Sequence, residues 1–578
     1  MVTARDVLAM LRELRDLTEI EEESPQSFKV RAYDNAIAGI ESAPGDVTAM
    51  SRAELVKLKG VGKSIADTVV ELVETGSVAR LEDLRSEYPA EFVELGKIPG
   101  LGPKTLKLIR RELGVENLDQ LTRAIADRRL RDLPGLGATS EEKLARAIGR
   151  LGLHGKDRRT PIAEAMPIAT QLVEELRALP GVDQVEFCGS LRRFSETIGD
   201  IDITVSSADP APVMDFVASH AQATEVVGHG ETKTSIVIRR GLQVDVRVVE
   251  PDQFGAAILY FTGSKTHNIA LRQRAIDRGM LLNEYGLHAA DGGELIASKT
   301  ESEIYTALDL PFILPPLREN SGEIEAAAHG EFPALIELPD ILGDLHVHTD
   351  RSGDGRSSLR QMVAAAAGRG YRYLGITDHG EDLAINGLSR GEMLALRDDI
   401  RDLQDEYPEV TLLYGCELNI GPDGSLDYDR RFRAGFDWCV ASVHSYFDLT
   451  ADEQTVRLIT AISDPSVNAI GHLTGRYIGR RPGIDLHLDP VLEAMAIADV
   501  GLEVNGALDR LDAPADVIRR ATAAGVRLVI STDAHHVSEF DRMAHGVRTA
   551  QRGWAATADI ANALSPEEFA AWAGQRKG

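Results

Sequence analysis

Six apolar runs in the second half of the chain, each of a length that suits one β-strand, end in a histidine, aspartate or glutamate. Helical stretches such as SSLRQMVAAAAGRG and DPVLEAMAIADVG lie between them. Strands that alternate with helices and carry functional residues at their C-terminal ends are typical of a parallel β/α barrel, whose site gathers at that end. We therefore predict such a barrel from the runs ILGDLHVH, YLGITDH, VTLLYGCE, WCVASVH, VNAIGH and VRLVISTDAH.

The first run leads into GDLHVHTD, residues 343–350, where two histidines stand one residue apart. In an extended chain, side chains two positions apart point to the same face, so His346 and His348 aim at one point. Convergent imidazoles indicate a metal site. A single buried histidine at a strand end is more often a core residue, but six runs that end this way are hard to attribute to packing.

A motif of an apolar residue, a Gly-Val-Gly or Gly-Leu-Gly turn and an amphipathic helix occurs three times, at 58–76, 98–114 and 133–149. The glycines permit positive φ, and the first N–H groups of each helix can face an anion. The motif resembles the helix-hairpin-helix element, which holds a DNA backbone phosphate without reading sequence. One copy could equally be a turn between packed helices. Three copies favour DNA binding at Gly60, Gly62, Gly100, Gly102, Gly135 and Gly137.

The net charge of −28 argues at first sight against a nucleic-acid partner. The average hides a local reversal, because residues 97–150 hold 12 Lys and Arg against 7 Asp and Glu. From residue 331 to the end the count is 24 against 39. A basic stretch is more often a solvated helix face, but two of the three glycine turns lie inside this one, so we expect it to meet DNA.

Two aspartates mark a second metal site in EFCGSLRRFSETIGDIDITV, residues 186–205. Asp200 and Asp202 share one face of a predicted strand, and near 4 Å they would repel by about 4 kcal/mol at an effective dielectric of 20. Divalent cations can compensate that repulsion. A third carboxylate, Asp245, lies in the apolar segment GLQVDVRVVE. Three aspartates on neighbouring strands can bind two Mg²⁺ ions for in-line phosphoryl transfer.

Residues 1–315 resemble family X DNA polymerases, the group of DNA polymerase beta, over their whole length. GSLRR…GDID is similar to the nucleotidyl-transfer motif, LYFTGSKTHNIALR (259–272) to the nucleotide-pocket segment, and NEYGL (283–287) to the thumb motif. The resemblance implies Mg²⁺ or Mn²⁺ at the three aspartates. It also implies a nucleotide site in which arginines and Ser190 hold the triphosphate, aromatic residues crowd the sugar, and Asn268 and Arg272 meet base and template. Those residues are Arg159, Ser190, Arg193, Gly199, Tyr260, Phe261, Gly263, Asn268 and Arg272.

Two positions depart from the family pattern. Ile198 stands where a serine often precedes Gly-Asp, which removes one triphosphate hydrogen bond. Thr68 stands where some members carry a Schiff-base lysine, and the nearby Lys63 lies in the wrong helical phase. A hydroxyl cannot form an imine, so we expect no lyase activity from this helix.

The half beyond residue 339 resembles the PHP (polymerase and histidinol phosphatase) family. That resemblance implies a distorted barrel of about seven βα units with up to three Mn²⁺, Zn²⁺ or Fe ions, Glu417 as a bridging ligand, and hydrolysis of phosphoesters. Asp378 and Arg476 are candidates for supporting or phosphate contacts. The implied ligands are His346, His348, Asp354, His379, Glu417, His444, His472, Asp533 and His535.

The predicted fold class is therefore multidomain α+β and α/β, with a nucleotidyltransferase palm built on an antiparallel or mixed sheet. We expect a helical gap-binding domain at 1–80, fingers at 81–155, palm at 156–258, thumb at 259–315, a Pro-rich then acidic linker at 316–339, and the PHP domain at 340–578. The predicted function is template-dependent gap filling in DNA repair, combined with a 3′–5′ exonuclease. AP-endonuclease or 3′-phosphatase action is a candidate further activity of the barrel, and the alternative is a barrel that is only structural.

The expected partners are gapped or nicked double-stranded DNA and dNTPs, and we expect a monomer. No apolar run approaches the roughly 20 residues of a membrane span. Three cysteines without a Cys-x-x-Cys pair predict a reducing compartment. We expect a cytoplasmic, nucleoid-associated protein. Three rival readings remain: a purely structural barrel, a non-enzymatic DNA scaffold, and a nucleotidyltransferase for a small molecule.

Overall fold

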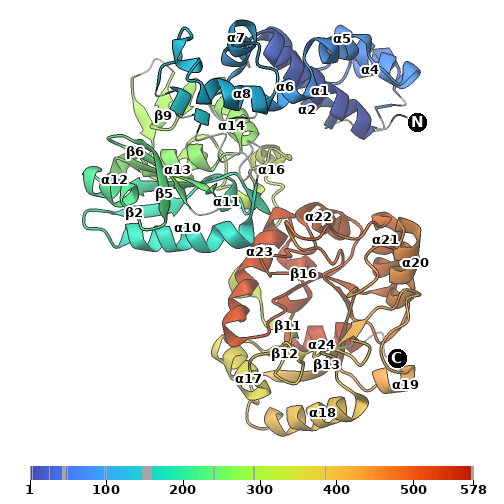
Figure 1. The fold of residues 1–578 in the computed structure, drawn as a ribbon. Coiled ribbons are helices and arrows are strands. Elements are labelled where there is room, and N and C mark those ends of the chain that lie inside the picture. Colours follow the sequence, from blue (N-terminus) through green and yellow to red (C-terminus); the bar gives the residue numbers. More distant parts are fainter. Residues whose placement is uncertain are drawn as a thin grey trace. The chain divides into compact units, whose positions relative to one another are not determined.

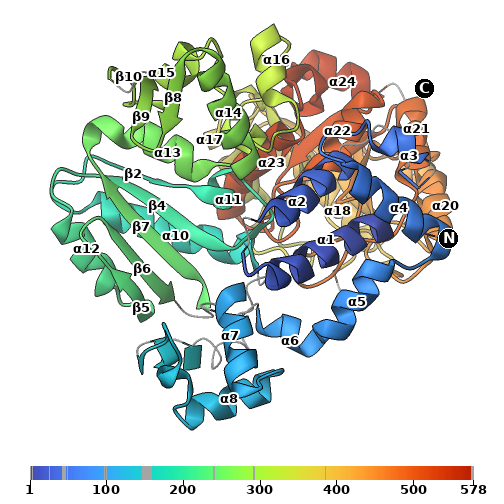
Figure 2. The ribbon, with the colours of Figure 1, turned by 90° about the horizontal axis from the view of Figure 1, so that it is seen from above.

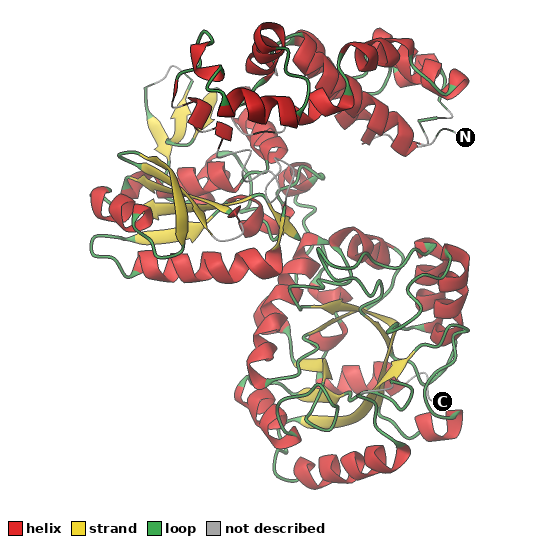
Figure 3. Cartoon of the chain, in the orientation of Figure 1, coloured by secondary structure: helices red, strands yellow, loops and turns green. Residues whose placement is uncertain are grey.

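The chain is described here from a computed structural model (Figures 1 and 3). The described residues are 2, 4–24, 27–41, 47–48, 50–96, 98, 101–138, 140–142, 144–145, 159–238, 241–290, 293–383 and 386–574. They form two compact units, residues 1–158 and 159–578, which we treat separately. Helical, mixed-sheet and barrel regions follow one another along the chain, which confirms the multidomain fold class. Among the described residues, no helix is both long and apolar enough to cross a membrane.

The first unit is helical throughout its described part, because apolar residues recur at three- and four-residue spacing and bury one face of each helix. One apolar core joins these helices. They are α1 (Ala4–Glu21), α2 (Phe28–Glu41), α3 (Arg52–Leu55), α4 (Lys63–Thr75), α5 (Ala79–Glu87), α6 (Ala90–Leu95), α7 (Pro103–Leu113), α8 (Leu118–Ala126) and the 3-10 turn η1 (Leu130–Asp132).

The second unit begins with a mixed sheet of five strands, seen side by side in Figure 2. Their order is β2 (Gln184–Phe187), β4 (Asp200–Ser206), β7 (Gln243–Val249), β6 (Lys233–Ile238) and β5 (Ala223–His229). Only β4 and β7 run parallel. Helices α10 (Ile162–Arg177) and α12 (Ala211–Ala218) pack on this sheet. The short α11 (Gly189–Arg192) and the pair β1 (Thr160–Pro161) and β3 (Thr197–Ile198) lie beside the β4 N-terminus.

The mixed sheet and its helices lie within residues 156–258, for which the sequence predicts the palm, and we keep that label for them. A small region follows and shares one apolar core with residues 313–327. The segment 316–339, for which the sequence predicts a linker, buries Arg318 and Glu323 and carries a helix. The elements are η3 (Pro251–Gln253), α13 (Phe254–Thr262), α14 (Lys265–Asp277), β8 (Met280–Asn283), β9 (Gly286–Ala289), β10 (Leu295–Ala297), α15 (Glu301–Ala307), η4 (Pro315–Leu317) and α16 (Glu323–His329).

The last region is a barrel of seven consecutive parallel strands among the described residues, visible as the yellow ring in Figure 3. A bridge between Val347 and Ala534 brings the first and last strands together, so the barrel is nearly closed. This confirms the predicted β/α barrel. The strands are β11 (Gly343–Val347), β12 (Tyr373–Ile376), β13 (Thr411–Asn419), β14 (Trp438–Ser442), β15 (Ala469–Gly471), β16 (Gly501–Asn505) and β17 (Leu528–Ser531).

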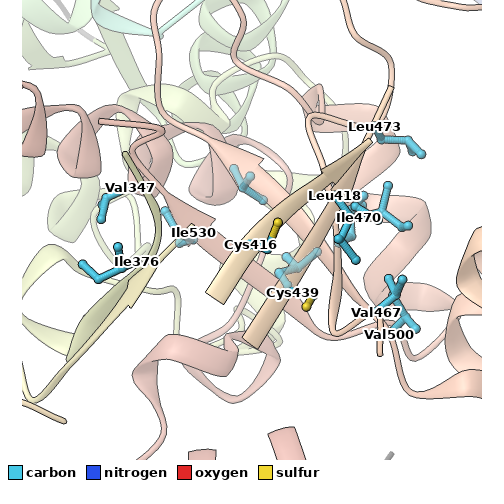
Figure 4. Close-up of a cluster of buried hydrophobic side chains, with 14 of the residues drawn as sticks. Val347, Ile376, Cys416, Leu418, Cys439, Val467, Ile470, Leu473, Val500 and Ile530 are labelled. Carbon is cyan, nitrogen blue, oxygen red and sulfur yellow. The ribbon is translucent and has the colours of Figure 1, made fainter. Parts of the chain in front are cut away.

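Helices and short turns surround these strands, and apolar strand residues such as Ile376, Leu418 and Ile470 belong to one buried cluster that also contains side chains of the surrounding helices (Figure 4). The three cysteines are buried free thiols, with Cys416 and Cys439 paired in register on β13 and β14. The surrounding elements are η5 (Leu338–Asp340), α17 (Leu359–Gly368), α18 (Arg390–Gln404), α19 (Arg430–Arg433), α20 (Ala451–Ile462), α21 (Leu488–Ala498), α22 (Ala515–Ala523), η6 (Val537–Arg542), α23 (Met543–Arg552), η7 (Thr557–Asp559), η8 (Ala561–Ala563) and α24 (Pro566–Gly574).

Candidate active sites

The palm carboxylates converge because β4 and β7 are parallel neighbours. Asp202 lies directly opposite Asp245 in the register, and Asp200 lies two residues before Asp202 on the same face. Burial, followed by the charges of Asp200 and Asp245, raises the pKa of Asp202 to about 7. Burial and the charge of Asp245 also raise the pKa of Asp200. Such a cluster of carboxylates favours a bound cation.

Lys233 is a palm residue that the sequence reading missed. Its Nζ lies 2.5 Å from Asp245 Oδ2, and Gln243 Nε2 donates to Asp245 Oδ1 at 2.8 Å. Burial opposes the charge on Asp245, but these hydrogen bonds and one from Ser235 outweigh it and lower the pKa of that carboxyl. Lys233 reaches the site through strand pairing of β6 with β7, which no local motif reports.

The surroundings of Gly189 explain why the Gly-Ser motif requires a glycine at this position. Its φ is +62°, and a Cβ at this position would lie 2.8 Å from Asp202 Oδ2. A side chain would therefore collide with the carboxylate and strain the backbone. Ser190 follows in α11, so the first residues of this short helix lie beside the Asp202 carboxylate.

The predicted triphosphate arginines are already engaged. Arg193 donates from Nε to Glu319 at 3.0 Å and from Nη1 to the Thr262 carbonyl at 2.6 Å. Arg159 donates from Nε to Thr197 Oγ1 at 2.8 Å and lies close to Gly199. These bonds hold the Arg159 guanidinium near the start of β4 and the Arg193 guanidinium beside Thr262 and Gly263.

The predicted sugar and base residues also lie together. Asn268 Nδ2 donates to the Tyr260 carbonyl at 2.7 Å, and Arg272 Nε donates to the Asn268 carbonyl at 3.2 Å. Phe261 meets Tyr260 edge to face, with ring centroids 5.1 Å apart. Gly263 lies two residues after Phe261, has φ +68° and caps the C-terminal end of α13, so the aromatic pair lies in the last turn of this helix.

In the first unit, helices α4 and α7 begin directly after the second glycine of their turns, at Gly62 and Gly102. A Cβ on either glycine would meet nothing within 4 Å, so both positions are open. Gly60 and Gly135, the first glycines of their turns, have φ values of +87° and +82°. Gly137 is also open, whereas Gly100 lies outside the described residues.

The barrel brings all nine predicted ligands to the C-terminal ends of its strands. Glu417 occupies the centre of the cluster. Its Oε1 lies 3.1 Å from His444 Nε2 and 3.0 Å from His472 Nε2. Its Oε2 lies 2.9 Å from His379 Nδ1 and within 3.5 Å of the Nε2 atoms of both His346 and His348. Of the remaining ligands, Asp533 lies within ion-pair distance of His346 and His348, and Asp354 lies within ion-pair distance of His379. His535 lies within ion-pair distance of Asp354.

The donor set fits several metal ions. His346 Nε2, His348 Nε2, His379 Nδ1 and Glu417 Oε1 are buried without a hydrogen-bond partner among the described residues. Unpartnered buried groups are costly, and a cation would satisfy them. Burial and the imidazoles of His535 and His379 lower the pKa of His348 to about 3, which keeps it neutral as a metal ligand must be. Three overlapping groups could each hold one ion: His348, Asp354, His379 and His535; His346, His348 and Asp533; and His379, Glu417 and His444.

Family models match most of the chain. A helix-hairpin-helix domain matches residues 3–78, a SAM-like helix-hairpin-helix tandem 92–150, the DNA polymerase beta thumb 257–319 and the PHP domain 344–507. The DNA polymerase/3′-5′ exonuclease PolX of Bacillus subtilis (strain 168) is 35% identical over 571 residues, which cover 98% of this chain and 99% of that protein. The chain belongs to the bacterial PolX family of DNA polymerase/3′-5′ exonucleases.

Two other relatives of this PolX-family chain match only parts of it. DNA polymerase lambda of Rattus norvegicus is 26% identical over 322 residues, half of the present chain. A probable phosphatase of Clostridium acetobutylicum is 28% identical over 214 residues, which are 82% of that protein and 35% of this chain.

Several side chains that are not predicted metal ligands contact the candidate ligands of this PolX-family barrel. His346 Nδ1 lies 2.6 Å from Glu503 Oε1, which leaves Nε2 to face the cluster. Asn505 Nδ2 donates to Asp533 Oδ2 at 3.1 Å, and His444 Nδ1 lies 2.9 Å from Asn419 Oδ1. Such partners orient metal ligands and tune their basicity. The sequence offered one signal for Glu503, a lone carboxylate in the apolar run GLEVN.

Two suggested phosphate contacts prove to have other partners. Asp378 is fully buried and accepts hydrogen bonds from Thr349 and Ser352, so it braces the loop after β11. Arg476 pairs with Glu196 of the palm at 2.8 and 3.0 Å and lies outside the metal cavity. A phosphate contact by either residue therefore stays a prediction, whereas the bonds of Asp378 fit the supporting role that the sequence also suggested for it. Arg481 and Arg510 line that cavity instead.

Proposed function

We propose that this chain fills short gaps in duplex DNA during repair and removes nucleotides from DNA 3′ ends at a separate site. The observation that carries the proposal is the presence of two chemically different metal-ligand clusters in one chain. One has three carboxylates on β4 and β7, and the other has histidines and carboxylates at the barrel strand ends. The substrates would be gapped or nicked DNA and dNTPs, and the active form would be a monomer.

For synthesis, we assign Asp200, Asp202 and Asp245 to a pair of Mg²⁺ or Mn²⁺ ions, which would neutralise phosphate charge when bound. Arg193 and Arg159 would hold the triphosphate, with Ser190 and Gly199 beside it. Tyr260, Phe261 and Gly263 would crowd the sugar, and Asn268 and Arg272 would meet the base and the template. The open turns at Gly60, Gly62, Gly102, Gly135 and Gly137, together with Gly100, would hold DNA phosphates.

For hydrolysis, we assign His346, His348, Asp354, His379, Glu417, His444, His472, Asp533 and His535 to as many as three metal ions. Imidazole-rich sites suit Mn²⁺, Zn²⁺ or Fe better than Mg²⁺. These ions would supply an activated water for attack on a phosphodiester. Glu503 and Asn419 would hold the imidazoles in the tautomers that ligation requires.

A second reading of the barrel, a 3′-phosphatase, draws on the similarity to the probable phosphatase of Clostridium acetobutylicum. The two activities differ in the bond that is cut. A duplex with a recessed 3′-phosphate distinguishes them, because a phosphatase releases inorganic phosphate and leaves the chain length unchanged. An AP-site duplex tests incision of abasic DNA in the same assay.

The decisive experiment is a primer-extension and degradation gel on a one-nucleotide-gapped duplex, in Mg²⁺ and in Mn²⁺. Asp200→Ala should lower incorporation by several orders of magnitude and leave degradation intact. His346→Ala combined with His348→Ala should abolish Mn²⁺-dependent degradation and leave incorporation nearly intact, because the two clusters share no ligand. A matched control replaces two exposed histidines, His329→Ala with His487→Ala, and should change neither activity. If the His346/His348 variant degrades DNA and the Asp200 variant does not, both assignments fail.

A further inference from the structure

The cavity above the barrel ligands has a second set of lining residues that the metal chemistry does not use. Its volume is about 380 Å³, and Phe447, Tyr477, Arg481 and Arg510 line it together with the ligands. Phe447 follows His444 by three residues, and Tyr477 follows His472 by five, so both aromatic rings come from loops that begin at ligands. The cavity volume lies at the lower end of the range of volumes found for ligand pockets.

These four side chains form an alternating stack of rings and guanidinium groups. The Arg481 guanidinium lies 3.8 Å from the Phe447 ring centroid and 4.8 Å from that of Tyr477. Arg510 lies 4.3 Å from the Tyr477 centroid and donates to its hydroxyl at 2.8 Å. Stacking of this kind fixes the guanidinium planes while leaving N–H groups at their edges.

One of the two positive charges of the stack, that of Arg481, has no ion-pair partner among the described residues. Arg481 donates Nε and Nη2 to the Gly475 carbonyl and forms no ion pair with any described carboxylate. Arg510 Nε lies 3.6 Å from Oδ2 of the ligand Asp533. A phosphate held at the metal cluster would therefore lie beside Arg510, with Arg481 one step further out.

We propose that Phe447, Tyr477, Arg481 and Arg510 form a binding site for the terminal nucleotide of an unpaired DNA 3′ end. The rings and guanidinium planes would stack on the base, and the guanidinium edges would hold backbone phosphate. We expect one nucleotide to enter this cavity, and a paired terminus would then have to open first. This inference rests on the proposed hydrolysis of 3′ ends.

The test uses the full-length protein in EDTA and a short single-stranded DNA with 2-aminopurine at its 3′ terminus. Stacking in the site should quench the fluorescence, whereas an internal 2-aminopurine should respond much less. Tyr477→Leu, Phe447→Leu and Arg481→Gln should each weaken this terminal quenching about tenfold in apparent affinity. Tyr477→Phe keeps the ring and should quench like the wild type. Melting temperatures of all variants show whether they fold.

The matched control is Arg480→Gln, which alters the exposed arginine next to Arg481 outside the cavity and should change nothing. A second readout compares kcat/KM in Mn²⁺ for the oligonucleotide and for bis-p-nitrophenyl phosphate, which lacks a base. Arg481→Gln should lower the ratio of the two about tenfold. Equal losses on both substrates, or terminal quenching unchanged in all ring variants, would overturn the nucleotide site. A wild type that quenches the probe but hydrolyses neither substrate would overturn the proposed nuclease alone.

Discussion

At the scale of single residues, Glu503 is a buried group outside the predicted ligand set that contacts the candidate metal centre. It accepts from Ser531 Oγ and from the backbone N–H of His472, and it lies 2.6 Å from His346 Nδ1. Three contacts fix the carboxylate, and the carboxylate in turn fixes the His346 ring. The ring then presents Nε2 to the cluster in the tautomer that a metal requires.

Glu503→Gln should therefore weaken Mn²⁺ binding by about 10- to 100-fold, since loss of such a partner lowers ligand basicity. Isothermal titration with Mn²⁺ measures the affinity, and primer extension in Mg²⁺ should be unchanged. The matched control is Glu493→Gln on an exposed position of α21. Equal Mn²⁺ affinities of the two variants would show that Glu503 does not support the ligands.

Eight of the nine candidate ligands could be predicted because they stand at the ends of strand-like runs, where sequence pattern and barrel geometry coincide. Asp354 lies in the loop after β11, and only the resemblance to the PHP family indicated it. The sequence did not allow us to predict that Lys233, Arg481 and Arg510 lie at the two candidate sites. Lys233 reaches Asp245 only through the pairing of β6 with β7, and the two arginines reach the cavity from irregular loops. The sequence also does not indicate the partner of Arg476, because Glu196 lies 280 residues away from it in the chain.

At the scale of elements, the glycine turns of the first unit divide into two kinds. Gly60 has φ +87°, and a Cβ there would lie 2.4 Å from the Asn35 carbonyl oxygen, so the fold itself requires this glycine. Gly62 and Gly102 have ordinary φ values of −79° and −70° and open space around them. The fold gives no reason for these two glycines, but close approach of a DNA backbone would.

Gly62→Ala combined with Gly102→Ala should consequently leave the melting temperature nearly unchanged and weaken binding of gapped DNA about tenfold or more, the effect of losing hydrogen bonds to charged phosphate. Fluorescence anisotropy at two salt concentrations measures the loss. Gly60→Ala is the contrasting variant and should lower the melting temperature. Unchanged DNA affinity of the double variant would contradict the phosphate-binding role of both turns.

Helix α4 carries Thr68 at the position where a Schiff-base lysine would stand, and its Oγ1 donates to the Ser64 carbonyl. A hydroxyl forms no imine. Borohydride should therefore trap little covalent adduct between this chain and a 5′-deoxyribose-phosphate substrate, as read from a denaturing gel. Efficient trapping that survives Lys59→Ala with Lys63→Ala would reveal a different amine.

At the scale of the whole second unit, palm and barrel share one apolar core. Leu511 is buried among the palm residues, with Leu508 and Ile478 packed beside it. Arg552 of α23 donates to Glu319 and to the Arg193 carbonyl, so the barrel also contacts the loop that carries a proposed triphosphate residue. The barrel is thus a structural support as well as a candidate catalytic domain, and the two readings of it are compatible.

His545 of α23 gives this contact a pH dependence. Its ring stacks near Phe194 of the palm, with centroids 5.8 Å apart, and its Nδ1 is buried without a described partner. Burial, followed by the charge of Arg548, lowers the pKa of His545 to about 4. Below the ordinary value of 6.5 the unfolded chain takes up a proton that the folded chain refuses, so stability falls as the pH falls from about 6.5 towards 4.

Between pH 7 and pH 5 this histidine alone should cost about 2 kcal/mol of unfolding free energy. The measurement is the melting transition of the second unit by calorimetry at both pH values. His545→Leu, which cannot be protonated, should lose less stability than the wild type over this interval, whereas His487→Leu at an exposed position should behave like the wild type. If the wild type and His545→Leu lose the same stability, the histidine is solvated in the folded protein, and the palm and barrel are less tightly packed than the stacking with Phe194 indicates.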